Sequence, residues 1–322
     1  MTICKKISMQ DIEAFTIGNA EYVEGATGCT VILPKKKGAT CGIDIRGGGP
    51  ASRESGLLNP LAANDSVNAV ILSGGSAFGL EASIGVMEEL EKRGIGFPTA
   101  NGVVPIVCQS CLFDLEMHTN SIRPDKALGK LALENAYLNN YKDGNFGAGC
   151  GATCGKAYGS EHMMKSGIGS AAFQVGDLQV GAIVATNCMG DVFDYTNGQQ
   201  IAGALDYDTN AFLNCEEAFY TMQANLTQHT NTTIGIILTN AAFNKTQLTK
   251  IASMAHDGMA RSINPIHTEF DGDTIYAMAS SEVQADINVV GTLAAKAFSE
   301  AITNSIKHAE TMYGIKAYKD LH

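Results

Sequence analysis

The sequence predicts a layered α/β or α+β sandwich, in which β-sheets are covered by helices. Short apolar strands are interspersed with helical patterns that are apolar on one face only, and such a helix has to bury that face against another element. An expected hairpin also argues against a purely parallel, doubly wound sheet. The chain has 322 residues and no Pro/Ser-rich linker, repeat or low-complexity block, so we expect a single domain over residues 1–322.

The first two strands come early in the chain. Residues 29–33 form an apolar run, and residues 40–46 alternate apolar with polar side chains, which is typical of strands. The turn that starts at Pro34 predicts a hairpin between them, with the lysines of residues 35–37 at its solvated tip.

A strand, a glycine turn and a helix follow one another next. Residues 69–72 are a short apolar strand, and residues 73–79 are rich in glycine and serine. Apolar residues then recur at helical spacing from Leu80 to Leu90, and the pattern stops at Gly94. This succession predicts an amphipathic helix that begins at a tight turn.

Strands and helices continue to the end of the chain. The expected elements are a helix at 125–138, strands at 180–186 and from 234, a helix at 246–259 capped by Thr246, a strand at 274–278 and a helix at 290–309. The last helix carries an apolar stripe along its whole length, so we expect it to pack on a sheet.

Composition limits the compartment and the partners. Hydrophobic residues make up 45 % of the chain, which is enough to build a sizeable core. The net charge of −11 argues against nucleic-acid and anionic-membrane partners, because both need clustered positive charge. The N-terminus is charged and has no apolar run long enough for a signal peptide or membrane span, so we expect a cytoplasmic protein. Nine cysteines fit reduced thiols, and because Cys108–Cys111 lacks the second half of a zinc site, we interpret the cysteines as buried small side chains.

Two hydroxyl groups, those of Thr232 and Thr233, stand at the start of a strand directly after Asn231. If the backbone is cut before Thr232, that residue gains a free α-amine beside its own hydroxyl. The α-amine has an ordinary pKa of roughly 7.7–8.0, so nucleophile and base would sit on one residue. The same residues also fit a simple turn into a β-branched strand, and the local sequence alone favours that interpretation.

Three further segments hold polar residues amid glycine or apolar sequence. Lys156 closes a glycine-rich loop and could support a nucleophile or an oxyanion; a P-loop fits poorly because Ala157 replaces the Ser or Thr that binds magnesium. Asn187 ends a strand, where it can donate to an oxyanion or cap a turn. Asp271 and Asp273 straddle a glycine at a strand entry, where they can orient an α-amine or form a plain Asp-Gly turn.

Ser73, Gly74, Gly75 and Ser76 lie between a strand and a helix, which is the setting of a nucleophile elbow. The G-x-S-x-G pattern is incomplete because Phe78 stands in place of its last glycine. We therefore expect these small residues to let a helix N-terminus approach the backbone or carboxylate of a substrate. A serine hydrolase that uses Ser76 is the alternative.

The chain resembles a known family of peptidases over nearly its whole length. The motifs that carry the resemblance are residues 28–31, 44–50, 72–80, 104–107, 151–156, 231–234, 254–258 and 270–274, together with Asn187. They are similar to those of the family that contains the L-aminopeptidase/D-esterase, the β-peptidyl aminopeptidases and the nylon-oligomer hydrolase. So many motifs in the same order make the resemblance specific.

This resemblance implies a four-layer αββα sandwich like that of N-terminal-nucleophile hydrolases. The residue roles that it implies are Thr232 as the nucleophile, Asn187 as the oxyanion-hole asparagine, Lys156 as the supporting lysine, and Asp271 and Asp273 as an acidic pair near the new amine. No metal or organic cofactor is needed for such chemistry.

The resemblance also implies a precursor that cleaves itself between Asn231 and Thr232, giving chains 1–231 and 232–322. Relatives in this family form oligomers, often tetramers, so it implies a homo-oligomer. One residue departs from the family pattern: where some relatives carry a catalytic tyrosine, this chain has Phe113, so that hydroxyl is missing or comes from another group. We expect Phe113 to contact the substrate together with residues 73–76.

The sequence thus predicts a self-cleaving threonine aminopeptidase or amidohydrolase that acts on small peptides or amino-acid amides. Two alternatives stay open: an acyltransferase of similar fold that passes its acyl group to an amino acid, and an uncleaved, non-enzymatic member whose glycine-lined cleft binds a small ligand. Nothing in the sequence separates α-, β-, D- and ω-amino substrates.

Overall fold

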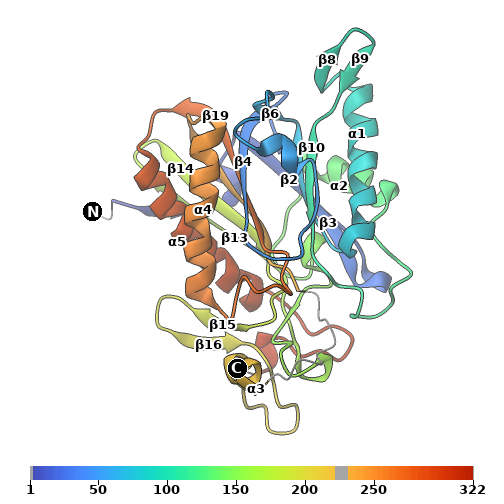
Figure 1. Cartoon of the computed structure of the whole chain (residues 1–322), viewed down its shortest axis with the longest axis vertical. Helices are drawn as coiled ribbons and strands as arrows, with labels where there is room; N and C mark the ends of the chain where they lie inside the picture. The colour runs from blue at the N-terminus through green and yellow to red at the C-terminus, as the bar shows by residue number, and fades with distance from the viewer. Residues whose placement is uncertain (1–2, 222–230, 322) are drawn as a thin grey trace.

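Two β-sheets pack face to face, and a pair of helices covers the outer side of each (Figure 1). The computed structural model describes residues 3–221 and 231–321. Helices α4 (Lys245–Ser262) and α5 (Ile287–Lys307) cover one sheet, and α1 (Ala82–Lys92) and α2 (Lys126–Tyr137) cover the other. The order of layers is therefore αββα, which confirms the expected architecture.

The strands divide unequally between the two sheets. The larger sheet consists, in spatial order, of β1 (Lys5–Ile7), β13 (Ile168–Val175), β14 (Leu178–Ala185), β17 (Ile234–Ala241), β19 (Thr274–Val283), β4 (Ala39–Ile45) and β6 (Ser66–Val67). The smaller sheet consists of β2 (Phe15–Tyr22), β3 (Thr27–Pro34), β7 (Ala69–Ser73), β10 (Val107–Cys111) and β5 (Ala51–Arg53). Both sheets mix parallel with antiparallel pairs.

Shorter elements complete the described part of the chain. These are β8 (Phe97–Thr99), β9 (Gly102–Val104), β11 (Thr153–Cys154), β12 (Met164–Lys165), β15 (Asp191–Asp194), β16 (Gln199–Ala202), β18 (Ile263–Asn264) and α3 (Cys215–Thr221). The β8–β9 hairpin projects from the body beside α1, and β15, β16 and α3 lie together at the opposite end (Figure 1).

Strand β17, which directly follows Thr232 and Thr233, is central in the larger sheet. All of its residues are buried, because Ile236 faces the layer between the sheets and Ile237 faces the covering helices. The strand pairs antiparallel with β14 and parallel with β19, so that Ile234 lies beside both Ala185 and Thr274. The end of β14 and the entries to β17 and β19 therefore meet at one place.

The expected hairpin after Pro34 is wrong. Strand β3 pairs with β2 and β7, whereas β4 pairs with β19 and β6, so this turn leads from one sheet into the other. A turn between two strands can either fold the second strand back on the first or carry it into a facing sheet, and the local sequence is compatible with both. The lysines of residues 35–37 are exposed, as the sequence indicates.

The start of α4 also differs from the prediction. Asn244, and not Thr246, caps the helix: its side chain accepts a hydrogen bond from the Gln247 N–H, and the Gln247 side chain accepts one from the Asn244 N–H. This reciprocal pair satisfies two N–H groups that a helix start leaves without partners, so it prevails over a lone threonine.

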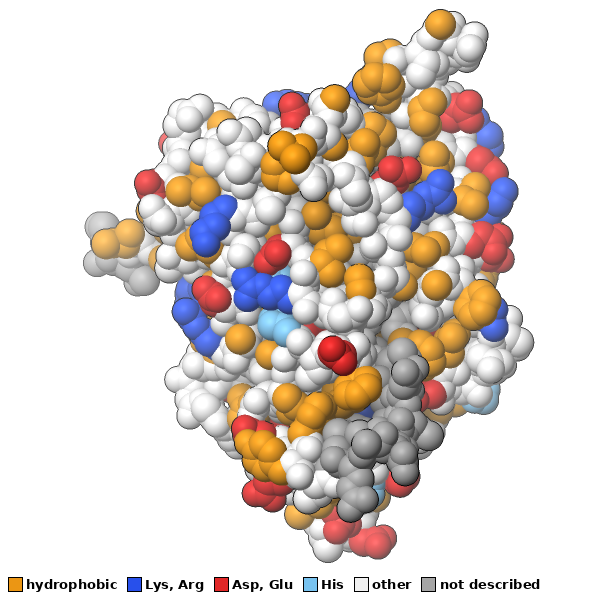
Figure 2. All heavy atoms as spheres, in the orientation of Figure 1, with side chains coloured by type: hydrophobic (Ala, Val, Ile, Leu, Met, Phe, Trp, Pro, Cys, Tyr) orange, Lys and Arg blue, Asp and Glu red, His pale blue; other side chains and the backbone are white. Residues whose placement is uncertain are grey.

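The nine cysteines are all free thiols, and Cys4 alone is not fully buried. Cys108 and Cys111 both lie on β10 inside the smaller sheet, which confirms their interpretation as buried small side chains. Among residues 3–221 and 231–321, no helix has the length and apolar character to cross a bilayer. On the face shown in Figure 2, basic and acidic side chains are interspersed.

Candidate active site

The peptide bond between Asn231 and Thr232 lies between two loops. The Asn231 N–H donates to the Phe270 carbonyl at 3.0 Å, and the Asn231 carbonyl accepts from the Gly272 N–H at 2.9 Å. The Thr232 N–H donates to the backbone carbonyl of Asn187 at 2.8 Å. The structure thus brings the loop before β19 and the loop after β14 to the two sides of this bond.

The Thr232 hydroxyl is buried and donates to the carbonyl oxygen of Asn231. The same oxygen also accepts from the Gly272 N–H. A β-carbon added to Gly272 would lie 2.7 Å from Thr232 Oγ1, so only glycine allows this approach. The Gly272 N–H was missed by the sequence analysis because a backbone donor has no side-chain signature; the Asp-Gly pattern indicated only a turn.

Asn187 is fully buried and its amide is held at both ends. Its Oδ1 accepts from Lys156 Nζ at 2.9 Å and from the Thr153 N–H at 3.0 Å, and its Nδ2 donates to the Phe113 carbonyl at 2.9 Å. An amide nitrogen carries two hydrogens, and Phe113 accepts one of them. These contacts fix the orientation of the amide and use one of its two N–H groups.

Lys156, whose Nζ donates to the Asn187 amide oxygen, has only 1 % of its side chain exposed. Burial lowers the pKa of its ammonium group, and the negative charge of Glu116, whose Oε1 lies 3.8 Å from Nζ, opposes that effect. An ammonium group that donates to the amide oxygen polarises the amide and makes Nδ2 of Asn187 a stronger donor. Glu116 is a second group that the sequence analysis did not single out.

Asp271 and Asp273 are both buried beside the start of β17. Asp273 Oδ1 accepts from the Thr233 N–H at 2.8 Å, and its Oδ2 lies 2.8 Å from His267 Nδ1. Asp271 Oδ2 accepts from the Thr268 hydroxyl at 2.6 Å. Burial, and next the charge of Asp273, raise the pKa of Asp271 to about 6, so this carboxyl can exchange a proton near neutral pH.

The glycines of residues 47–49 pack against the acidic loop. The Gly47 N–H donates to the Asp273 carbonyl at 3.3 Å and the Gly49 N–H to the Asp271 carbonyl at 2.9 Å. A β-carbon on Gly47 would lie 2.3 Å from the Asp273 backbone nitrogen. This part of the 44–50 motif therefore allows a close backbone contact that holds the two acids in place.

The turn at residues 73–76 lies next to the residue that anchors the Asn187 amide. Leu112 joins the two, because its N–H donates to the Ser73 carbonyl at 2.8 Å and its carbonyl accepts from the Ser76 N–H at 2.9 Å. Phe113 follows directly and is partly exposed. The Ser73 hydroxyl itself is buried and accepts from Gln109 Nε2 at 2.8 Å, so its side chain faces the protein interior.

Asp114 fixes the glycines of this turn. Its Oδ1 accepts from the Gly75 N–H and its Oδ2 from the Thr27 hydroxyl, each at 2.7 Å. A β-carbon on Gly74 would lie 1.8 Å from Asp114 Oδ2, so a larger residue does not fit. Burial raises the pKa of Asp114 from 3.8 to about 6.

Asp114→Asn should change the way stability depends on pH. Between about pH 4 and 6 the folded wild type holds a proton on Asp114 that the unfolded chain has released, so this carboxyl lowers the free energy of unfolding as pH rises through that window. The free energy of unfolding of the variant relative to wild type should therefore increase from pH 4 to pH 7, as measured by urea denaturation. A difference that is constant with pH would contradict the raised pKa, and exposed Asp257→Asn controls for the loss of one charge.

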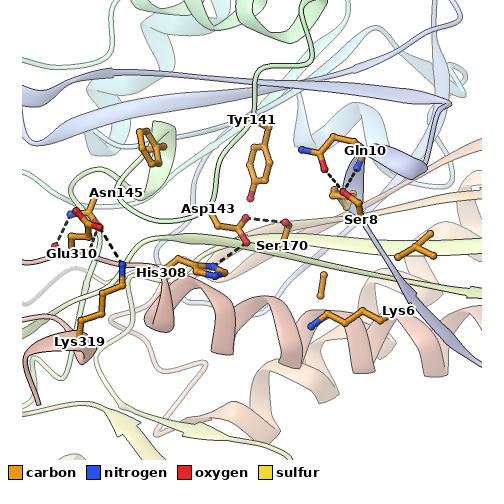
Figure 3. A pocket seen from close by; sticks show the side chains of 14 residues that line it. Lys6, Ser8, Gln10, Tyr141, Asp143, Asn145, Ser170, His308, Glu310 and Lys319 are labelled. Atoms are coloured by element: carbon orange, nitrogen blue, oxygen red, sulfur yellow. Dashed lines mark hydrogen bonds and ion pairs between the residues drawn. The ribbon is translucent and has the colours of Figure 1, made fainter. Parts of the chain in front are cut away.

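A cavity of about 540 Å³ lies elsewhere, next to β1 (Figure 3). Tyr141, Asp143, Ser170 and His308 line it, and Asp143 joins two of them: its Oδ1 accepts from the Ser170 hydroxyl at 2.9 Å and its Oδ2 lies 3.3 Å from His308 Nδ1. Among the described residues its lining includes none of those around Thr232. This cavity is therefore separate from the residues singled out by sequence.

Sequence comparison relates the chain to known hydrolases. The model of peptidase family S58 matches residues 8–319. A 6-aminohexanoate-oligomer endohydrolase of Kocuria sp. (strain KY2) is 33 % identical over 278 residues, which cover 85 % of this chain and 75 % of that protein. An uncharacterized aminopeptidase of Mycobacterium tuberculosis (strain H37Rv) is 34 % identical over 345 aligned residues, covering 98 % and 97 %.

Solved structures share the fold. The L-aminopeptidase D-Ala-esterase/amidase of Ochrobactrum anthropi, described as a new variant of the Ntn hydrolase fold, superposes with a TM-score of 0.72 at 16 % identity, covering 95 % of this chain and 87 % of that one. A β-aminopeptidase of Burkholderia sp. gives a TM-score of 0.67 at 17 % identity, covering 96 % and 90 %.

Proposed function

Because this chain belongs to peptidase family S58 and is a hydrolase of peptide or amide bonds, we propose that Thr232 is its nucleophile and that it cleaves itself between Asn231 and Thr232. The observation that supports this most is the hydrogen bond of the Thr232 hydroxyl to the Asn231 carbonyl oxygen, together with the Gly272 N–H on the same oxygen. Nucleophile, carbonyl group and polarising donor are adjacent.

Self-cleavage would proceed by an N-to-O acyl shift. Thr232 Oγ1 attacks the Asn231 carbonyl carbon, and the Gly272 N–H stabilises the oxyanion. The bond from that carbon to the Thr232 nitrogen breaks, and the hydroxyl proton ends on the nitrogen, which becomes a free amine. Water then hydrolyses the ester, releasing the carboxylate of Asn231 and restoring the hydroxyl of Thr232.

Turnover would use the same residue. The α-amine of Thr232, next to the Asn187 carbonyl that its nitrogen already contacts at 2.8 Å, accepts the hydroxyl proton as Oγ1 attacks a substrate carbonyl. The Asn187 amide, polarised by Lys156, donates to the oxyanion. The resulting ammonium protonates the leaving amine, and water hydrolyses the acyl-enzyme.

We propose small peptides or amino-acid amides with a free amino end as substrates, and hence an aminopeptidase. The buried acids Asp271 and Asp273 give the site negative charge that suits an ammonium group. The cytoplasmic location and the homo-oligomer expected from the sequence stay predictions.

Intact-mass measurement and N-terminal sequencing of the purified protein test the proposal. We expect chains 1–231 and 232–322, the second beginning Thr-Thr-Ile-Gly, and release of p-nitroaniline from part of a panel of α-, β-, D- and ω-amino acyl anilides. An intact 33.9 kDa chain without turnover would overturn the proposal in favour of a ligand-binding member. Added amines that become acylated in preference to water would indicate an acyltransferase.

A further inference from the structure

His267 lies on the other side of Asp273 from the proposed nucleophile. Its Nδ1 is 2.8 Å from Asp273 Oδ2, and its backbone N–H donates to the same oxygen at 3.2 Å. The other carboxylate oxygen accepts from the Thr233 N–H. Asp273 is fully buried. One buried carboxylate therefore connects an imidazole with the residue that follows Thr232.

The backbone of His267 has an unusual conformation. Its φ angle is 60°, in the left-handed region that residues with a β-carbon seldom adopt. Such a conformation persists only where its surroundings hold it, and it is concentrated at functional sites. Here it accompanies an arrangement in which the backbone N–H and the ring nitrogen of His267 both address a single oxygen of Asp273.

The surroundings of the imidazole favour a hydrogen-bond donor at Nδ1. The His256 ring from α4 packs edge-on against the His267 ring, with 4.7 Å between the ring centroids. Burial lowers the pKa of His256 to about 4, so this neighbouring ring is neutral near pH 7. The Nε2 atom of His267 is buried and has no hydrogen-bond partner within the described ranges. With a carboxylate on Nδ1, that nitrogen carries the hydrogen in either charge state of the ring.

We propose that His267 is a positioning residue of the reaction, which holds the Asp273 carboxylate on the Thr233 N–H and thereby fixes Thr232 at the start of β17. This inference rests on the proposed role of Thr232. Without the imidazole, Asp273 Oδ2 loses its partner at Nδ1, and the carboxylate is free to turn away from the Thr233 N–H. The start of β17, and with it Thr232, then loses its fixed position.

The test compares His267→Asn with His267→Gly. Both residues tolerate a left-handed backbone, but only asparagine offers a side-chain N–H in place of Nδ1. We expect His267→Asn to keep kcat/KM within a fewfold of wild type and His267→Gly to lose roughly ten- to a hundredfold, the size of a lost hydrogen bond to a charged group. Equal losses in the two variants would overturn the proposal, because the backbone alone would then explain them.

The split between kcat and KM separates positioning from a purely structural role. A nucleophile that has lost its position lowers kcat without changing substrate binding, so we expect the loss in His267→Gly in kcat, with KM near that of wild type. A loss that lies mainly in KM contradicts the proposal.

Before the variants are compared, the wild-type protein must show the new N-terminus Thr-Thr-Ile-Gly and hydrolyse an anilide substrate. If the wild type shows neither, the proposed function fails before the variants are compared. If the wild type is active and the two variants behave alike, the role of His267 alone fails. Thermal unfolding of each variant confirms that the proteins compared are folded.

Discussion

Thr232→Ala should yield a single uncut chain without hydrolytic activity. The substitution removes the hydroxyl that donates to the Asn231 carbonyl oxygen, so neither the acyl shift nor the acylation of substrate has a nucleophile. Loss of a nucleophile typically lowers kcat on the order of a millionfold. Denaturing electrophoresis should show two bands for the wild type and one for the variant, and an anilide assay should fall to background.

Thr233→Val is the matched control. Thr233 is also a buried threonine, one residue further along, but its hydroxyl has no hydrogen-bond partner among residues 3–221 and 231–321. Replacing a hydroxyl of that kind by a methyl group of the same shape costs little, so we expect normal cleavage and near-normal activity. Two bands from Thr232→Ala, or one band from Thr233→Val, would show that Thr232 is not the nucleophile of self-cleavage.

Asn187→Ala should lower kcat by roughly a hundred- to a thousandfold, the usual effect of removing one oxyanion donor. The change also takes the amide oxygen away from Lys156, which leaves a buried ammonium group without its 2.9 Å partner. The backbone carbonyl of Asn187, which accepts from Thr232, is still present in the variant. We therefore expect the loss mainly in kcat, measured by steady-state kinetics on processed enzyme.

Asn240→Ala controls for the loss of a buried asparagine. Asn240 stands at the far end of β17, where its Oδ1 accepts from the Gln179 N–H and its Nδ2 donates to the Asp177 carbonyl, each at 2.8 Å. The variant should be destabilised in urea to a similar extent, by about 1–3 kcal/mol, while its kcat stays near wild type. Equal losses of kcat in both variants would show that Asn187 acts through stability and not on the reaction.

Strong apolar patterning was sufficient to predict α5 and β17. The apolar stripe of the helix and the β-branched run of the strand both occur where the sequence places them. Strand β10 was missed because its middle residues are polar: Gln109 donates to the Ser73 hydroxyl and the Gly79 carbonyl, and Ser110 contacts the Tyr276 hydroxyl. Such hydrogen bonds satisfy polar groups inside a sheet, and they come from residues distant in the sequence.

The side chains of the candidate site were proposed from the sequence, but their assembly was not. The local setting of Thr232, Asn187 and Lys156 also fits ordinary turns and a surface lysine, and the resemblance to the peptidase family singled them out. Their meeting depends on β17 pairing with both β14 and β19, which no local pattern specifies. The Gly272 N–H and His267 act through a backbone group and a loop conformation, so the residue types alone do not reveal them.

The place of β17 and β19 in the larger sheet determines what scission would do to the molecule. Both strands belong to the stretch after residue 231, and they are flanked by β14 on one side and β4 on the other, which come from the stretch before it. Strands of the two fragments would thus be hydrogen-bonded side by side in one sheet, and neither fragment could dissociate without breaking that sheet. Cleavage of the backbone would create a new N-terminus while the two fragments remain associated.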